Sequence, residues 1–107
     1  MEIRLTGGAD ESQGIVELGF DGAWGTVCDD WWDKSDADVV CRQLGYKHTV
    51  LALGPSTYPL TKRRIWIDNV NCKGEERSLL DCDFLGWGIT NCGYHQEAGV
   101  ICSSKLH

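Results

Sequence analysis

The six cysteines of this 107-residue chain limit its possible folds more than any other feature. No two of them are spaced as CxxC, so the ligand pattern of a structural zinc site is missing. An even number of cysteines in a small domain predicts three disulfides and an oxidising, extracellular location. The alternative is a cytosolic protein with reduced, buried thiols, which we disfavour because free thiols are reactive. Spacing alone does not select one set of pairings.

Length and charge restrict the function further. A chain of 107 residues fits one domain, and its formal net charge of −6 comes from 16 acidic and 10 basic residues. This charge argues against binding to nucleic acid or to an anionic membrane surface, and it suits a cation or a basic partner. No apolar run reaches the length of a membrane span, and no signal peptide is recognisable. We therefore expect one extracellular domain over residues 3–103, excised from a longer protein, with residues 1–2 and 104–107 as terminal additions.

Alternating apolar residues predict strands in the first thirty residues. Residues 3–5 and 16–20 place every second side chain on one face, as a half-buried strand does. Asp21 and Gly22 form the dipeptide that favours a tight hairpin turn. The returning strand at residues 24–28 then places Trp24, Thr26 and Cys28 on one face.

The next segment changes to helical spacing. Ser35 is a suitable N-cap residue, Asp36 and Asp38 suit the positive first turn, and Gly45 is a suitable C-terminal stop. The apolar side chains recur at intervals of three and four residues, which predicts that one stripe of the helix faces the core. This stripe consists of Ala37, Val40, Cys41 and Leu44.

The second half of the chain predicts short elements separated by loops. Residues 47–64 contain one glycine and two prolines and are interpreted mainly as loop. A strand is predicted at residues 65–67, a helical turn at 75–80, a loop at 87–91 and a final strand at 98–102. Many strands with one good helix indicate an α+β domain that is mostly β.

Four motifs occur in a fixed order along the chain. They are WGTVCDD at residues 24–30, VVCRQLGY at 39–46, IWIDNVNCKGEERSLLDC at 65–82 and AGVIC at 98–102. Together they resemble a scavenger receptor cysteine-rich (SRCR) domain, and the six-cysteine form is similar to group A of that family. The resemblance implies a small disulfide-stapled domain, with a curved antiparallel sheet cradling one α-helix. It also implies the pairs Cys28–Cys92, Cys41–Cys102 and Cys72–Cys82.

The acidic residues of this pattern are candidate calcium ligands. The resemblance implies one ligand set at Asp29 and Asp30, completed at a glutamate position that falls here on Gln96, with Glu97 as the alternative. It implies a second set at Asp33, Asp68 and Asn91. Oxygen ligands of this mixed type suit Ca²⁺, and the neutral amides predict weak binding. The alternative is a set of solvated acids that cap turns and the helix.

Two further groups are candidate ligand-binding residues. Trp31 and Trp32 are neighbours, so a strand or turn cannot bury both on one face, and we expect Trp31 to be exposed beside the acids. Exposed tryptophan is a frequent binding hot spot, although it can also fold over nearby loop atoms. The basic run Lys62, Arg63 and Arg64 is a candidate contact for polyanions, or alternatively a solvated loop.

No catalytic motif is present. The chain has no GxSxG, HExxH, P-loop or dinucleotide fingerprint, so we expect no enzyme activity from this domain. The resemblance implies an extracellular, calcium-supported module of a scavenger receptor in innate immunity, which binds polyanionic or protein ligands and has neighbouring domains in a larger parent chain. The alternatives are an accessory domain of a secreted modular enzyme, either a serine protease or a lysyl-oxidase-like amine oxidase, and a structural spacer.

Overall fold

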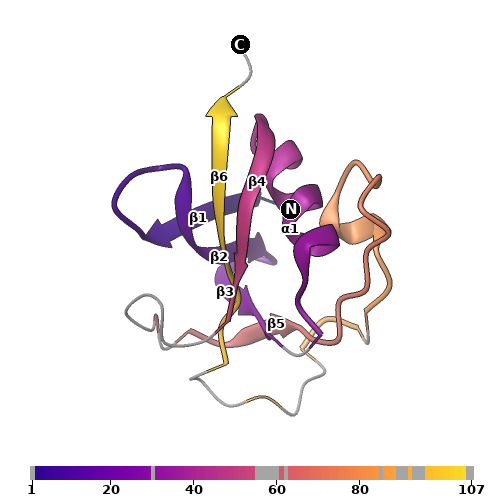
Figure 1. The fold of residues 1–107 in the computed structure, drawn as a ribbon. Helices are drawn as coiled ribbons and strands as arrows, with labels where there is room; N and C mark the ends of the chain where they lie inside the picture. Colours follow the sequence, from indigo (N-terminus) through magenta and orange to yellow (C-terminus); the bar gives the residue numbers. More distant parts are fainter. Residues whose placement is uncertain are drawn as a thin grey trace.

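The described part of the chain is one curled sheet with a helix packed against it (Figure 1). The computed structural model describes residues 2–29, 31–54, 61, 63–84, 86–88, 92 and 96–105, and for residues 104 and 105 the backbone alone. The elements within these residues are β1 (Glu2–Gly7), β2 (Gln13–Phe20), β3 (Ala23–Val27), α1 (Lys34–Gln43), β4 (Tyr46–Leu53), β5 (Ile65–Ile67), a 3₁₀ turn (Leu79–Asp81) and β6 (Gly99–Lys105). The predicted α+β class with one cradled helix is confirmed.

The sheet has the strand order β4-β6-β2-β3-β5, and β1 pairs with β2. Its pairings are antiparallel except that of β3 with β5, which is parallel and matches Thr26 with Ile65 and Val27 with Ile67. Because parallel strands end at the same edge of a sheet, the residues that follow β3 and β5 lie close together. The first and last strands of the chain, β1 and β6, extend beyond residues 3–103, to Glu2 and to Lys105.

The helix begins earlier than predicted. Its N-cap is Asp33, whose carboxylate accepts a hydrogen bond from the Asp36 N–H at 3.2 Å, while the Asp36 carboxylate accepts one from the Asp33 N–H at 2.9 Å. This reciprocal capping box satisfies two N–H groups at once, so the prediction of Ser35 as the cap is wrong. The predicted stop at Gly45 is confirmed, because its N–H donates to the Arg42 carbonyl and its φ is +93°.

Part of the predicted loop over residues 47–64 is a strand. Residues 46–53 form β4, which pairs with β6 through contacts such as Ala52 with Val100. Local sequence does not reveal β4, because its side chains do not alternate in burial and Val50 and Leu51 are about half exposed. The partner strand lies far along the chain, so only the tertiary pairing makes this segment a strand.

Three disulfides fasten the sheet, the helix and the loops. The structure joins Cys28 to Cys92, Cys41 to Cys102 and Cys72 to Cys82, the pairs that the SRCR resemblance implies, and no cysteine is free. Cys41–Cys102 attaches α1 to β6 across the core. Sequence separations of 64, 61 and 10 residues correspond to about 4, 4 and 3 kcal/mol of stabilisation in the chain-entropy model.

Four of the five tryptophans, Trp24, Trp32, Trp66 and Trp87, are partly buried. Trp32, Trp66 and Trp87 pack against the apolar core, whereas Trp24 lies under the guanidinium of Arg4. A Cβ at Gly25 would lie 2.4 Å from the Trp66 ring, so only glycine lets this indole pack on the strand.

Asp36 is a buried carboxylate with two backbone partners. One oxygen accepts from the Cys72 N–H at 2.8 Å and the other from the Asp33 N–H, and the side chain is 1% exposed. Burial raises the pKa of Asp36 from 3.8 to about 6, against the opposing effect of these two N–H groups; the charge of Asp33 contributes in the same direction as burial.

We predict a pH-dependent contribution of Asp36 to stability. Between pH 3.8 and about 6 the folded protein binds more protons at Asp36 than the unfolded chain does, so this contribution is lost as the pH rises through that window. The difference in unfolding free energy between the wild type and Asp36→Asn should therefore change by about 1–3 kcal/mol across it. Urea denaturation in a chelating buffer measures this difference. A pH-independent difference for Asp36→Asn would contradict the prediction.

Candidate functional site

Two predicted metal ligands meet at the edge where β3 and β5 end. The Cys28 N–H donates to the Ile67 carbonyl at 3.0 Å, so Asp29 and Asp68 follow directly after paired residues. The Cys28–Cys92 disulfide lies beside both: Oδ1 of Asp29 is 3.9 Å from Sγ of Cys28, and an Asp68 oxygen lies within 4.8 Å of both sulfur atoms. The structure thus brings these two carboxylates to one disulfide.

Asp33 and Asp68 also have structural roles. Asp33 caps α1 through Oδ1, and Asp68 is fully buried, with Oδ1 accepting from the Asn69 N–H at 2.7 Å. Among the residues that the structure describes, each group of three close potential ligand atoms contains two disulfide sulfurs, so Asp29, Asp33 and Asp68 do not converge there as a set. The predicted ligands Asp30 and Asn91 lie outside the described residues.

The alternatives for the third ligand differ in their surroundings. The Gln96 carbonyl accepts the Asp29 N–H at 2.9 Å, so Gln96 lies beside the first acid. Glu97 is buried, and its carboxylate accepts hydrogen bonds from the backbone N–H and the hydroxyl of Thr61. Gln96 thus contacts Asp29 through its backbone, whereas the Glu97 carboxylate is already hydrogen-bonded to Thr61.

The buried carboxylate of Glu17 binds two arginines at the surface. Glu17, on β2, is 2% exposed; Nη2 of Arg4 lies 2.7 Å from Oε1, and Nε of Arg63 lies 3.2 Å from Oε2. The Thr6 hydroxyl also donates to Oε2 at 3.1 Å. Because a buried charge needs a partner, Glu17 fixes both guanidinium groups, whose side chains remain about 40% exposed.

Aromatic rings restrain the arginines further. The Arg4 guanidinium lies 3.7 Å from the centre of the Trp24 ring, and that of Arg64 lies 5.0 Å from the Trp66 ring, in cation–π contacts. We call Arg4, Arg63 and Arg64 the arginine group. Sequence reasoning identified Arg63 and Arg64 but missed Arg4; an acid amid the apolar residues of a strand was the signal that a basic partner was required. Lys62 lies outside the described residues.

The segment that carries Arg63 is held at both ends by buried acids. Glu97 binds Thr61, the Thr61 hydroxyl accepts the Arg63 N–H at 3.1 Å, and the Arg63 side chain binds Glu17. Glu97, predicted as a possible metal ligand, therefore positions the basic segment. Glu17 and Glu97, each 2% exposed, thus restrain Arg63 and Thr61. Sequence alone could not distinguish this basic run from a solvated loop.

Trp31 is exposed, as predicted. Its side chain is 81% exposed, whereas the neighbouring Trp32 donates its indole N–H to the Gly99 carbonyl at 3.0 Å. Trp31 lines a hollow of about 320 Å³ together with Asp33, Asn69 and Asn71. Its backbone has φ +65°, a left-handed conformation that raises the free energy of a bulky residue by about 1–3 kcal/mol.

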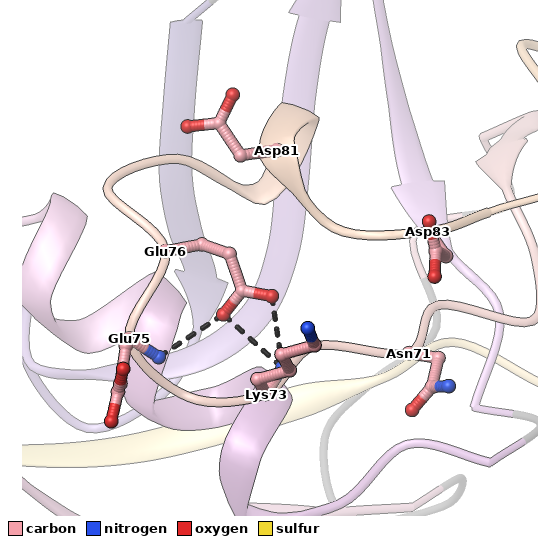
Figure 2. A pocket seen from close by; sticks show the side chains of 6 residues that line it. All are labelled: Asn71, Lys73, Glu75, Glu76, Asp81 and Asp83. Carbon is pink, nitrogen blue, oxygen red and sulfur yellow. Dashed lines mark hydrogen bonds between the residues drawn. The ribbon is translucent and has the colours of Figure 1, made fainter.

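A neighbouring hollow of about 410 Å³ is rich in acids (Figure 2). Glu76 turns toward the backbone there and accepts hydrogen bonds from the N–H groups of Lys73, Gly74 and Glu75, which lower its pKa. Asp81 and Asp83 stand apart from the Glu76 carboxylate. In this hollow the Glu76 carboxylate fastens the loop that carries it, and the acids do not converge as metal ligands.

The comparisons agree on one family. The model described as the scavenger receptor cysteine-rich domain matches residues 6–103. Galectin-3-binding protein of Rattus norvegicus is 46% identical over 103 residues, which are 96% of this chain and 18% of that protein. Lysyl oxidase homolog 2 of Xenopus laevis is 43% identical over 106 residues, 98% of this chain and 14% of that protein. The chain thus spans less than a fifth of these relatives.

Two solved structures share the fold. The third SRCR domain of murine neurotrypsin has a TM-score of 0.86 at 44% identity and covers 94% of each chain. The dimeric form of the SRCR domain of mouse MARCO has a TM-score of 0.79 at 46% identity, covering 94% of this chain and 93% of that one. Within the described residues no helix has the length and apolar character to cross a bilayer.

We predict that replacing Trp31 with glycine does not weaken the fold. Glycine adopts positive φ without the steric penalty of a Cβ, and little buried area is lost at an 81% exposed side chain. Glycine also increases the conformational entropy of the unfolded chain, which offsets part of this gain. Trp31→Gly should therefore raise the unfolding free energy by about 0.5–1 kcal/mol in urea denaturation. Trp31→Ala keeps the Cβ and should show no such gain. A marked loss of stability in Trp31→Gly would mean that the indole is a packing residue.

Proposed function

Because this chain belongs to the scavenger receptor cysteine-rich (SRCR) family, we propose that it binds polyanionic ligands outside the cell through its arginine group. SRCR domains are non-catalytic modules of extracellular proteins or ectodomains. What an individual domain binds is decided by its surface, and the surface of this one carries three restrained guanidinium groups.

The observation that carries the proposal is the anchoring of Arg4 and Arg63 by buried Glu17. A guanidinium presents several N–H donors in a plane, which suits the paired oxygens of sulfate or phosphate groups. Because the side chains are already restrained, binding requires less ordering than it would on a mobile loop. The net charge of −6 opposes polyanions at long range, so attraction depends on this local group.

A second candidate role is that of an accessory domain in a modular enzyme. The similarity to lysyl oxidase homolog 2, and to an SRCR domain of neurotrypsin, favours it. In that role the domain itself stays non-catalytic and its surface binds a protein or matrix component. The parent chain distinguishes the two roles: an oxidase or protease domain after this one supports the second, and a collagenous stalk or membrane span supports the first.

We further propose that Ca²⁺ supports this surface. The donors that flank the Cys28–Cys92 disulfide, Asp29 and Asp68, are carboxylates, which fit calcium and not a soft metal. Together with Asp30, Asn91 and Gln96 they would hold the ion, which would neutralise charge near residues 28–29 and 96–97. We leave Asp33 out of this set, because it caps α1 and lies in no close group of potential ligand atoms among the described residues.

We predict that the basic residues determine binding to sulfated polysaccharide. The double variant Lys62→Ala/Arg64→Ala leaves the contacts of Glu17 intact, so it should fold normally and bind heparin several-fold more weakly, with a smaller dependence on salt. Arg4→Ala should also weaken binding, because one of the restrained guanidinium groups is lost. Surface plasmon resonance at several salt concentrations measures both effects.

The matched control for the double variant is Lys34→Ala/Lys47→Ala, which removes the same charge from α1 and from the edge strand β4. If this control weakens heparin binding as much as the double variant does, affinity follows net charge alone. Binding that is unchanged in Lys62→Ala/Arg64→Ala and in Arg4→Ala would place the ligand elsewhere on the domain.

We predict that calcium raises the melting temperature. An ion that binds only the folded form stabilises it by mass action, by about 1.4 kcal/mol at ten times the dissociation constant, which we expect to be about 10⁻⁴–10⁻³ M. Calorimetry should show this rise in the wild type and no rise in Asp29→Asn/Asp68→Asn. Asp81→Asn/Asp83→Asn, with the same change of charge at exposed positions, should keep it. Equal rises in both double variants would refute a site at the disulfide.

A further inference from the structure

The hollow around Trp31 has the composition of a carbohydrate site, and we propose that it binds a neutral sugar residue of a glycan. It is about 320 Å³ in volume and is lined by Trp31, Asp33, Asn69 and Asn71. None of these residues belongs to the arginine group, so the inference is independent of polyanion binding. A pyranose ring has an apolar face of C–H groups and a rim of hydroxyl groups, and the hollow offers a partner for each.

Trp31 supplies the apolar surface. Its indole is 81% exposed and is the most exposed large hydrophobic side chain in the described part of the chain. The adjacent Trp32 packs against the core, and its indole N–H donates to the Gly99 carbonyl. This turn is therefore anchored by Trp32 and not by Trp31. Trp31 therefore presents an aromatic face that the fold does not use, and such faces bind flat, partly apolar groups.

The rim supplies hydrogen-bonding groups that the domain leaves open. Oδ1 of Asp33 binds the Asp36 N–H, but within the described residues Oδ2 has no partner. The side-chain amides of Asn69 and Asn71 likewise make no hydrogen bond with the described part of the chain. A carboxylate oxygen accepts, and an amide both donates and accepts, which matches hydroxyl groups that do both.

Two residues of the hollow have a left-handed backbone conformation, which is unfavourable for tryptophan and tolerated by asparagine. Trp31 has φ +65° and Asn69 has φ +54°; of the described non-glycine residues only Asp21, in the hairpin turn, also has positive φ. Glycine would adopt both conformations more easily. Strained positions that retain a side chain are concentrated at binding sites, and here two of them line one hollow.

The charge of the lining defines the class of ligand. Among the described residues, the lining contains no lysine or arginine to pair with a sulfated or acidic sugar. Its described members are one carboxylate, of which one oxygen already binds the helix N-terminus, and two neutral amides beside Trp31. The two amides, which both donate and accept, favour a polyhydroxyl ligand, and a basic side chain of a protein partner is the alternative that the test distinguishes.

The test is an NMR titration of the full domain with neutral oligosaccharides of glucose, galactose, mannose and N-acetylhexosamine units. The indole N–H signal of Trp31 is assigned by its loss in Trp31→Gly. At least one oligosaccharide should shift this signal with a dissociation constant in the millimolar range. Trp31→Gly and Asn69→Gly both suit the positive φ, so they should fold and should weaken binding at least tenfold, as followed by saturation transfer to the sugar.

Leu80→Ala is the control, because Leu80 is an exposed hydrophobic residue outside the hollow and its loss should change nothing. The proposal is wrong if no oligosaccharide of the panel shifts the Trp31 signal, or if Trp31→Gly binds the sugar as the wild type does. It is also wrong if only acetyl-arginine amide binds, with affinity lost in Asp33→Asn and at high salt. Lys62→Ala/Arg64→Ala should leave sugar binding unchanged, so the fate of polyanion binding does not affect the result.

Discussion

The buried charge of Glu17 links the sheet of this domain to its surface. A carboxylate in the middle of β2 is tolerated only when cations lie beside it, so Glu17 depends on the guanidinium groups that reach it. Arg4 and Arg63 meet this requirement from segments far apart in the chain. Glu97 acts on the same region through Thr61. Glu17 and Glu97 therefore fix the positions of the basic residues at this surface. The same contacts satisfy the two buried carboxylates and so stabilise the fold.

This arrangement explains how an acidic domain can present a basic surface. The net charge of −6 describes the field at a distance, where salt screens it, whereas contacts at a few ångströms depend on local groups. Many of the acids have structural roles: Asp33 and Asp36 cap the helix, and Glu76 closes its own loop. Asp29 and Asp68 are instead gathered at one disulfide by the parallel ends of β3 and β5. Composition cannot separate these roles, because it does not record which acids are already paired.

Local patterns predicted the elements whose partners lie nearby. The hairpin around Asp21 and the helix stripe with Cys41 were correct because turn chemistry and helical periodicity act over a few residues. The helix start was misplaced from Asp33 to Ser35, since the choice between neighbouring caps depends on the reciprocal bond with Asp36. Strand β4 was missed because its pairing with β6 is distant and its exposed side chains show no alternation.

The sequence by itself determined the class of domain, its disulfide-bonded, extracellular character and the exposure of one member of the Trp31–Trp32 pair. These follow from cysteine content, motif order and the alternation of neighbouring side chains, which are properties of the chain alone. Tertiary structure alone decided that Arg4 joins Arg63 at Glu17, that Glu97 holds Thr61, and that Trp31 shares a hollow with Asn69. Apart from Arg4 and Glu17, which are 13 residues apart, these contacts join residues separated by more than thirty positions. Their proximity depends on strand register and on burial, which no local pattern encodes.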